Sequence, residues 1–170
     1  MEKFEDIHEK ASWFRGEFLN RMSWMEKSLD TYIAKHFSGD DVQKEKDIHL
    51  LFLGDNRVTM ENKKQIFHFL AEKYDNEWYE FYNSEIFDNA SKSKSIDLNK
   101  DITELIKIRN VLAHRIVETN PVEDKREGYV GFSTYKNTKE VTYISDEQFI
   151  KMVNAMYSIT SYIDKRVLKW

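Results

Sequence analysis

The chain has 170 residues, of which 41% are hydrophobic and 33% charged, with a formal net charge of −4. This apolar content excludes an intrinsically disordered protein, whose composition combines low hydrophobicity with high net charge, and the length suits a single domain over residues 1–170. The acidic balance excludes a general nucleic-acid coat, which needs a strongly basic surface. A small local site that acts on RNA remains compatible with it. The chain has no cysteine, which excludes disulfides and thiolate metal sites.

The apolar runs of the chain are short. Residues 1–6 are mostly charged and lack the apolar core of a signal peptide. The longest unbroken apolar run, residues 50–53, is far shorter than the roughly 20 residues that span a bilayer. We therefore expect a cytoplasmic protein without membrane contact.

The first half of the chain carries helical patterns. Glycine and proline number five and one, and this scarcity favours long helices with few sharp turns. Apolar residues spaced three and four apart predict a first helix over residues 12–37. A short helix over residues 47–53 follows. Thr59 then offers an N-cap for another helix over residues 60–74.

The second half mixes helices with one β-hairpin. The aromatic-rich residues 76–87 predict a helix, and a serine–lysine loop at residues 91–95 leads into a long helix over residues 97–118. β-forming residues on both sides of a polar turn predict a hairpin at residues 128–145. Ser145 opens the last helix. The expected fold is mainly α, a helical bundle of about five helices with a small β-hairpin inserted before the last one.

The helix predicted over residues 97–118 has an unusual distribution of charge. At about 100° per residue, its polar side chains gather within roughly 60° of one another: Thr103, Lys107, Asn110 and His114. Its apolar side chains lie opposite them: Ile102, Leu105, Leu112, Ala113 and Ile116. Arg109 lies near the middle of this apolar arc, where a leucine would be expected.

The position of Arg109 leaves three alternatives. A guanidinium cannot stay in a core without hydrogen-bonded partners, because burying an unpaired charge is costly. Arg109 must therefore meet a carboxylate in a structural salt bridge, reach outward along its stem, or face another subunit. The candidate acids on the first predicted helix are Glu17, Glu26 and Asp30.

Asn110 and His114 suit acid–base chemistry. They are i, i+4 neighbours on one helix face, so their side chains can touch. An amide can fix the tautomer of an imidazole, histidine transfers protons near neutral pH, and a nearby guanidinium can stabilise a phosphorane-like anion. Together with Arg109 these side chains suit cleavage of RNA, in which the ribose 2′-OH attacks its own phosphate. No metal or cofactor is expected.

One regular helix cannot easily bring Arg109 and His114 to the same phosphate. They are five positions apart, which places them about 140° apart around the helix axis. A two-fold dimer that faces two copies of this helix would bring both pairs into one cleft. The sequence therefore predicts a homodimer.

The segment 108–114 resembles the signature of HEPN domains (higher eukaryotes and prokaryotes nucleotide-binding). That signature is an Arg, a spacer of four to six residues and a His, often with a polar residue directly after the Arg. Here the spacer has four residues and the polar residue is Asn110. The resemblance implies a metal-independent endoribonuclease with a composite active site in a dimer, acting as a toxin, phage-defence effector or RNA-processing enzyme. It also implies that Arg109 and His114 are catalytic and that Asn110 supports them.

A second function remains open, because some HEPN relatives are regulators or interaction modules without nuclease activity. In that case the chain is a non-catalytic helical dimer that binds a partner protein. No antitoxin is fused to the chain, so any antitoxin or regulatory protein would be separate. The remaining histidines show no metal-ligand spacing and are expected at the surface or the core edge: His8, His36, His49 and His68.

Overall fold

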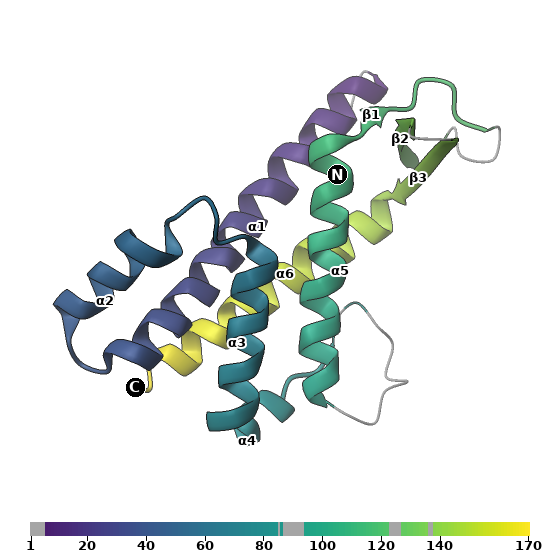
Figure 1. Cartoon of the computed structure of the whole chain (residues 1–170). Coiled ribbons are helices and arrows are strands. Elements are labelled where there is room, and N and C mark those ends of the chain that lie inside the picture. Colours follow the sequence, from purple (N-terminus) through teal and green to yellow (C-terminus); the bar gives the residue numbers. More distant parts are fainter. Residues whose placement is uncertain (1–5, 85, 87–93, 123–126, 136–137) are drawn as a thin grey trace.

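The computed structural model describes residues 6–84, 86, 94–122, 127–135 and 138–170. Within this part of the chain, helices pack side by side and a small antiparallel sheet lies at one end of the molecule (Figure 1). The predicted mainly α fold is confirmed. No helix among the described residues combines the length and the apolar character that crossing a membrane requires.

Among the described residues, the strands lie in the last third of the chain, between two long helices. In chain order the elements are α1 (Ile7–Ser38), α2 (Val42–Ile48), the π-helical turn η1 (His49–Leu53), α3 (Met60–Tyr74), α4 (Asn76–Glu80), α5 (Lys94–His114), β1 (Ile116–Val117), β2 (Tyr129–Tyr135), β3 (Lys139–Ser145) and α6 (Asp146–Val167).

Side-chain caps set the beginnings of α1, α3 and α6. Asp6 accepts a hydrogen bond from the Glu9 amide at 2.8 Å, so α1 begins five residues before the predicted boundary. The predicted cap at Thr59 is confirmed, and with Asn62 it forms a reciprocal capping box on α3. Ser145 caps α6 in the same way. These local hydrogen bonds explain why two of the three beginnings could be predicted from the sequence.

Three predicted elements have different bounds in the structure. The helix expected over residues 76–87 is only α4, which ends at Glu80, and residues 85 and 87 lie outside the described residues. The helix expected over residues 47–53 begins earlier, as α2, and continues as the π-helical turn η1. In the loop expected at residues 91–95, Lys94 and Ser95 belong to α5, while residues 91–93 lie outside the described part.

The predicted hairpin is confirmed and gains a third strand. β2 and β3 pair antiparallel, with Tyr129 opposite Ser145; the turn residues 136–137 are outside the described residues. The helix predicted over residues 97–118 ends at His114, because the chain then turns into β1. Ile116 of β1 pairs with Ser133 of β2. The sheet order is therefore β1-β2-β3, and the sheet begins where α5 ends.

The core joins α1 to α6 along much of their length. Phe14 of α1 stacks on Phe149 of α6 with ring centroids 3.9 Å apart, and both side chains are buried. At the other end of α1, the Tyr32 hydroxyl donates to Asp75 at 3.1 Å, and Arg166 of α6 forms an ion pair with the same carboxylate. Full burial of one large apolar side chain contributes about 1.5–3 kcal/mol. α1 is therefore anchored to α6 at both ends, and α5 and the sheet pack against it.

Candidate functional site

The last two turns of α5 carry the segment that we singled out in the sequence. Arg109 is half-buried, whereas Asn110 and His114 are exposed. A guanidinium nitrogen of Arg109 (Nη1) donates a hydrogen bond to Asn110 Oδ1 at 3.2 Å. The structure thus joins Arg109 to Asn110 and places His114 at the end of the same helix.

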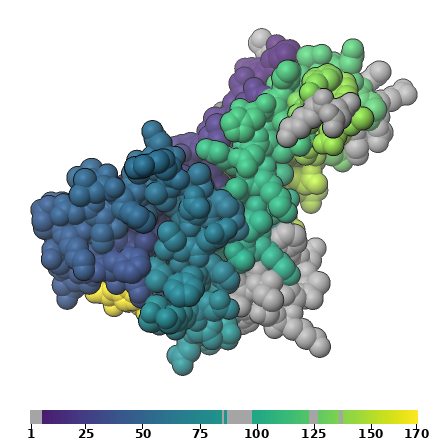
Figure 2. Space-filling view, viewed as in Figure 1, coloured from purple at the N-terminus to yellow at the C-terminus, as the bar shows by residue number. Residues whose placement is uncertain are grey.

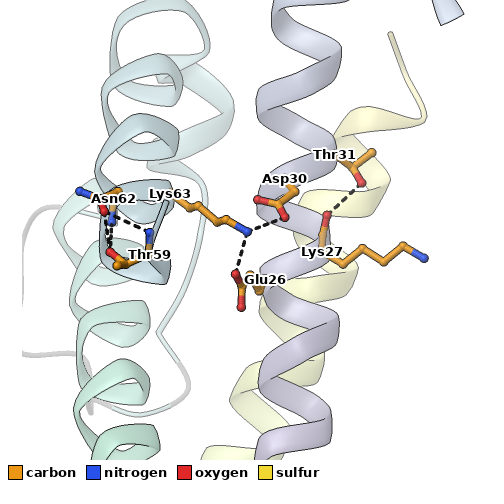
Figure 3. A network of polar contacts seen from close by, with 7 residues as sticks. All are labelled: Glu26, Lys27, Asp30, Thr31, Thr59, Asn62 and Lys63. Carbon is orange, nitrogen blue, oxygen red and sulfur yellow. Dashed lines mark hydrogen bonds and ion pairs between the residues drawn. The ribbon is translucent and has the colours of Figure 1, made fainter. Parts of the chain in front are cut away.

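Two acids expected beside Arg109 belong to a buried lysine instead. Figure 3 shows the Lys63 ammonium group of α3 between Glu26 and Asp30 of α1, at 2.7 Å and 2.8 Å from their carboxylate oxygens. Burial raises the pKa of Asp30, and the hydrogen bond from Lys63 opposes that shift. The prediction that either acid neutralises Arg109 is therefore wrong.

The third candidate acid is also occupied, since Glu17 pairs with Arg21 within α1 at 2.7 Å. Among the described residues, no carboxylate forms an ion pair with Arg109. The physical reason is that Arg109 is only half-buried, so water solvates part of its charge. For the described part of the chain, the structural salt bridge is thus replaced by a hydrogen bond to Asn110.

The predicted apolar face of this helix is only partly covered. Ile102, Leu105 and Leu112 are buried as expected. Ala113 is exposed, and Ile116, which lies beyond the helix in β1, keeps 66% of its surface. The C-terminal end of α5 therefore extends past the main core, and its last turn is accessible from outside.

A cavity of about 710 Å³ lies beside this last turn. Its walls come from the first turns of α1, from the end of α5, from β1 and the residues after it, and from the end of β2. The charged and polar side chains that line it are His8, Arg15, His114, Arg115, Glu118, Thr119 and Tyr135. Arg109 and Asn110 do not line it. The structure thus brings His114 into a cavity with His8 and two arginines, and leaves the other two predicted site residues outside.

Both arginines of the cavity are held in place by hydrogen bonds. Arg15 Nη2 donates to the main-chain carbonyl of Arg115 at 2.5 Å, and its guanidinium lies 5.4 Å from the ring centre of Phe132. Arg115 Nη1 donates to Thr142 Oγ1 at 2.6 Å. Neither guanidinium forms an ion pair with a carboxylate of the described residues. The two positive charges are therefore fixed at the cavity wall without being neutralised there.

Glu118, the one carboxylate among the described residues that line the cavity, is already paired. Glu118 is buried, accepts hydrogen bonds from Ser133 at 2.6 Å and from the Asn120 amide at 3.0 Å, and pairs with Lys139 at 2.5 Å. The hydrogen bond from Lys139, followed by those from Ser133 and Asn120, lowers the pKa of Glu118 to about 2. Since Lys139 already balances this charge, the described residues that line the cavity carry a net positive charge.

The lowered pKa of Glu118 predicts how stability depends on pH. Its stabilising contribution is fully present above the ordinary pKa of 4.5 and is lost as the pH falls toward about 2. We expect Glu118→Gln to lower the free energy of unfolding at pH 7 by about 1.5–3 kcal/mol, the net value of hydrogen bonds to a charged group. Denaturant titrations of both proteins between pH 7 and pH 2 measure this. The gap between them should close below pH 4.5, and an equal gap at every pH would contradict the assignment.

Most residues of the cavity could not be predicted from the sequence. From the sequence, His8 was expected at the surface or the core edge, Tyr135 was expected only as a strand residue, and Arg15 and Arg115 were not expected in a site. The only local signal was Arg115, which directly follows His114. The other side chains reach the cavity through the packing of α1 against α5 and the sheet, which no short motif encodes.

Neither a metal cluster among the described residues nor a comparison with known proteins identifies the site. Within the described residues, no group of three or more His, Cys, Asp or Glu side chains could hold a metal ion. Comparisons of the chain with protein-family models, curated proteins and solved structures gave no match. The fold and the site define a mainly α protein with a cationic cavity at the end of one helix.

Proposed function

We propose that this protein is a metal-independent endoribonuclease of the HEPN type, with Arg109, Asn110 and His114 as its catalytic residues. The proposal rests on one observation: these side chains are free to contact a substrate, because they are neither fully buried nor paired with a carboxylate of the described residues. His114 is exposed beside a cationic cavity, and Arg109 is held by Asn110 and by no carboxylate of the described residues. A motif kept only for packing would bury these groups or pair their charges.

The chemistry follows from these groups and from RNA. The ribose 2′-OH is the nucleophile, His114 transfers a proton, and the guanidinium of Arg109 stabilises the charge on the phosphorane-like transition state. The O2′–P bond forms while the P–O5′ bond breaks. The products are a 2′,3′-cyclic phosphate and a 5′-hydroxyl.

In this proposal, Arg109 reaches the reacting phosphate from the partner protomer of a homodimer. Arg109 does not line the cavity of its own chain, and it lies about 140° around the helix axis from His114. Two copies of α5 facing each other across a two-fold axis would place Arg109 of one protomer near His114 of its partner. Light scattering at working concentration tests this: a dimeric mass supports the composite site, and a clean monomer rejects it.

The products provide the direct test of the reaction. Purified protein is incubated in EDTA with a single-stranded RNA oligonucleotide and with the same sequence made of DNA. We expect cleavage of the RNA alone, leaving 2′,3′-cyclic phosphate ends that mass spectrometry identifies. Cleavage of the DNA oligonucleotide as well as the RNA, or RNA products with 3′-hydroxyl ends, would reject the mechanism. The resemblance to HEPN toxins adds a separate antitoxin or regulatory protein as a further partner.

One observation favours the non-catalytic alternative, a regulator or interaction module. The π-helical turn η1 exposes Leu50, Leu51 and Phe52, with 75%, 79% and 53% of their surfaces accessible. Adjacent exposed apolar side chains are typical of protein interaction sites. Under this alternative the protein cleaves no RNA, and His114→Ala leaves partner binding unchanged.

A further inference from the structure

We propose that the cavity beside His114 binds a phosphodiester of single-stranded RNA, that Arg15 and Arg115 hold the phosphate, and that His8 is a second catalytic residue. The inference rests on the proposed function, because it concerns the same substrate. It goes beyond that function by assigning groups from α1 that the HEPN-like segment does not contain. It also makes the proton-transfer site complete within one chain.

The two arginines suit a phosphate because their positions are fixed in advance. Arg15 is held by the Arg115 carbonyl and the Phe132 ring, and Arg115 is held by Thr142. Guanidinium groups make strong, directional hydrogen bonds to phosphate oxygens. Since Glu118 is balanced by Lys139, an anion that enters the cavity meets positive charge without a competing free carboxylate on the described wall.

Histidines from two distant parts of the chain line this cavity. His8 lies in the first turn of α1 and His114 at the end of α5, and both line it. In the purple first turns of α1 and the green end of α5, the two helices come together near the sheet (Figure 1). Figure 2 shows the same region as the arm of the molecule that projects away from α2 and α3.

Two imidazoles suit cleavage by a ribose hydroxyl, because the reaction has two proton transfers and each imidazole can perform one. One accepts the proton of the 2′-OH as the O2′–P bond forms, and the other donates a proton to the 5′-oxygen as the P–O5′ bond breaks. The protonated and the neutral imidazole exchange roles after one turnover, so water must reset them. No other reactant is required.

The exposed ring of Tyr135 indicates whether single-stranded or double-stranded RNA binds in the cavity. It lies at the end of β2, lines the cavity and keeps 64% of its surface exposed. Exposed aromatic rings stack on unpaired bases, whereas bases within a duplex are already stacked. The site therefore favours single-stranded RNA over a duplex.

Binding and cleavage are measured separately. A fluorescent 2′-O-methyl RNA oligonucleotide cannot be cleaved and reports binding alone by anisotropy. We expect Arg115→Gln to weaken this binding about tenfold and to reduce the slope of log affinity against log salt by about 0.7, the value of one lost phosphate contact on a single strand. We expect His8→Asn to bind nearly as the wild type does and to cleave the unmodified RNA about 10²-fold more slowly.

Matched controls come from the same side-chain types outside the cavity. Arg57→Gln and His49→Asn remove one guanidinium and one imidazole that do not line it, and both should behave as the wild type does. Thermal melting confirms that each variant is folded; His8 is exposed, so its replacement should leave stability unchanged.

A substrate with an activated leaving group separates catalysis from structure. Uridine 3′-(4-nitrophenyl phosphate) loses its leaving group without a proton donor. Only one of His8→Asn and His114→Ala, the variant that lacks the general acid, should regain activity on it. Rescue of both variants, rescue of neither, or wild-type cleavage by His8→Asn would overturn the assignment of His8.

The two proposals fail in different ways. If the wild type cleaves RNA but Arg115→Gln binds as tightly as Arg57→Gln does, the phosphate site is rejected and the nuclease stands. If the wild type binds the oligonucleotide through Arg115 but leaves RNA intact in every condition, the nuclease is rejected and the phosphodiester site stands.

Discussion

Arg109→Ala is expected to lower the rate of RNA cleavage about 10²–10³-fold while leaving the protein folded. Loss of one group that stabilises transition-state charge has this effect in other enzymes. Because no described carboxylate pairs with Arg109, and Asn110 is its hydrogen-bond partner, removing the guanidinium leaves no buried acid without a cation. Initial rates in EDTA and thermal melting curves measure the two effects.

Lys107→Ala is the matched control for this prediction. Lys107 is an exposed cation on the same helix, paired with Glu104 at 3.2 Å. Its loss should leave the rate within about twofold, because surface ion pairs contribute little. If Arg109→Ala cleaves RNA as fast as Lys107→Ala does, Arg109 has no catalytic role. If Arg109→Ala melts far below the wild type, the guanidinium is structural.

Lys63→Met is expected to lower the free energy of unfolding by about 3–5 kcal/mol, the usual effect of removing one partner from a buried ion pair. Lys63 retains only 5% of its accessible surface and bridges Glu26 and Asp30 (Figure 3). Without the ammonium group, two neighbouring carboxylates of α1 are left facing each other. Denaturant titration at pH 7 measures the loss.

Two further variants identify the cause of that loss. Arg57→Met breaks the ion pair between Arg57 and Asp55. The Arg57 side chain is almost fully exposed, so this variant should unfold at nearly the same denaturant concentration as the wild type. Adding Glu26→Gln and Asp30→Asn to Lys63→Met removes the unpaired charges and should restore most of the stability. A triple variant as unstable as Lys63→Met would show that packing, and not charge, sets the cost.

Features encoded within a few residues could be predicted from the sequence. The caps at Thr59 and Ser145 are local hydrogen bonds, and the strands at residues 128–145 follow from neighbouring β-forming side chains. The end of α5 could not be predicted in this way. Residues 115–118 fit a helical pattern, and they leave the helix because β1 pairs with β2, more than a dozen residues further along the chain.

The residues of the candidate site also differ in whether the sequence could predict them. Arg109, Asn110 and His114 were found because they lie within one helical segment and resemble a known motif. His8 and Arg15 lie at the opposite end of the chain, and only the packing of α1 against α5 and the sheet brings them to His114. The acids expected beside Arg109 were misassigned for a related reason: Lys63 of α3, which approaches α1 from the side, takes two of them.

The most direct test of the central claim is incubation of the purified protein with total cellular RNA in EDTA, with the wild type beside His114→Ala. His114 is exposed at the end of α5, so its replacement should leave the fold intact. We predict cleavage by the wild type and a rate lower by about 10²–10⁴-fold for the variant, the usual contribution of a general acid or base. Equal cleavage by both proteins, or intact RNA with both, would contradict a nuclease that acts through His114.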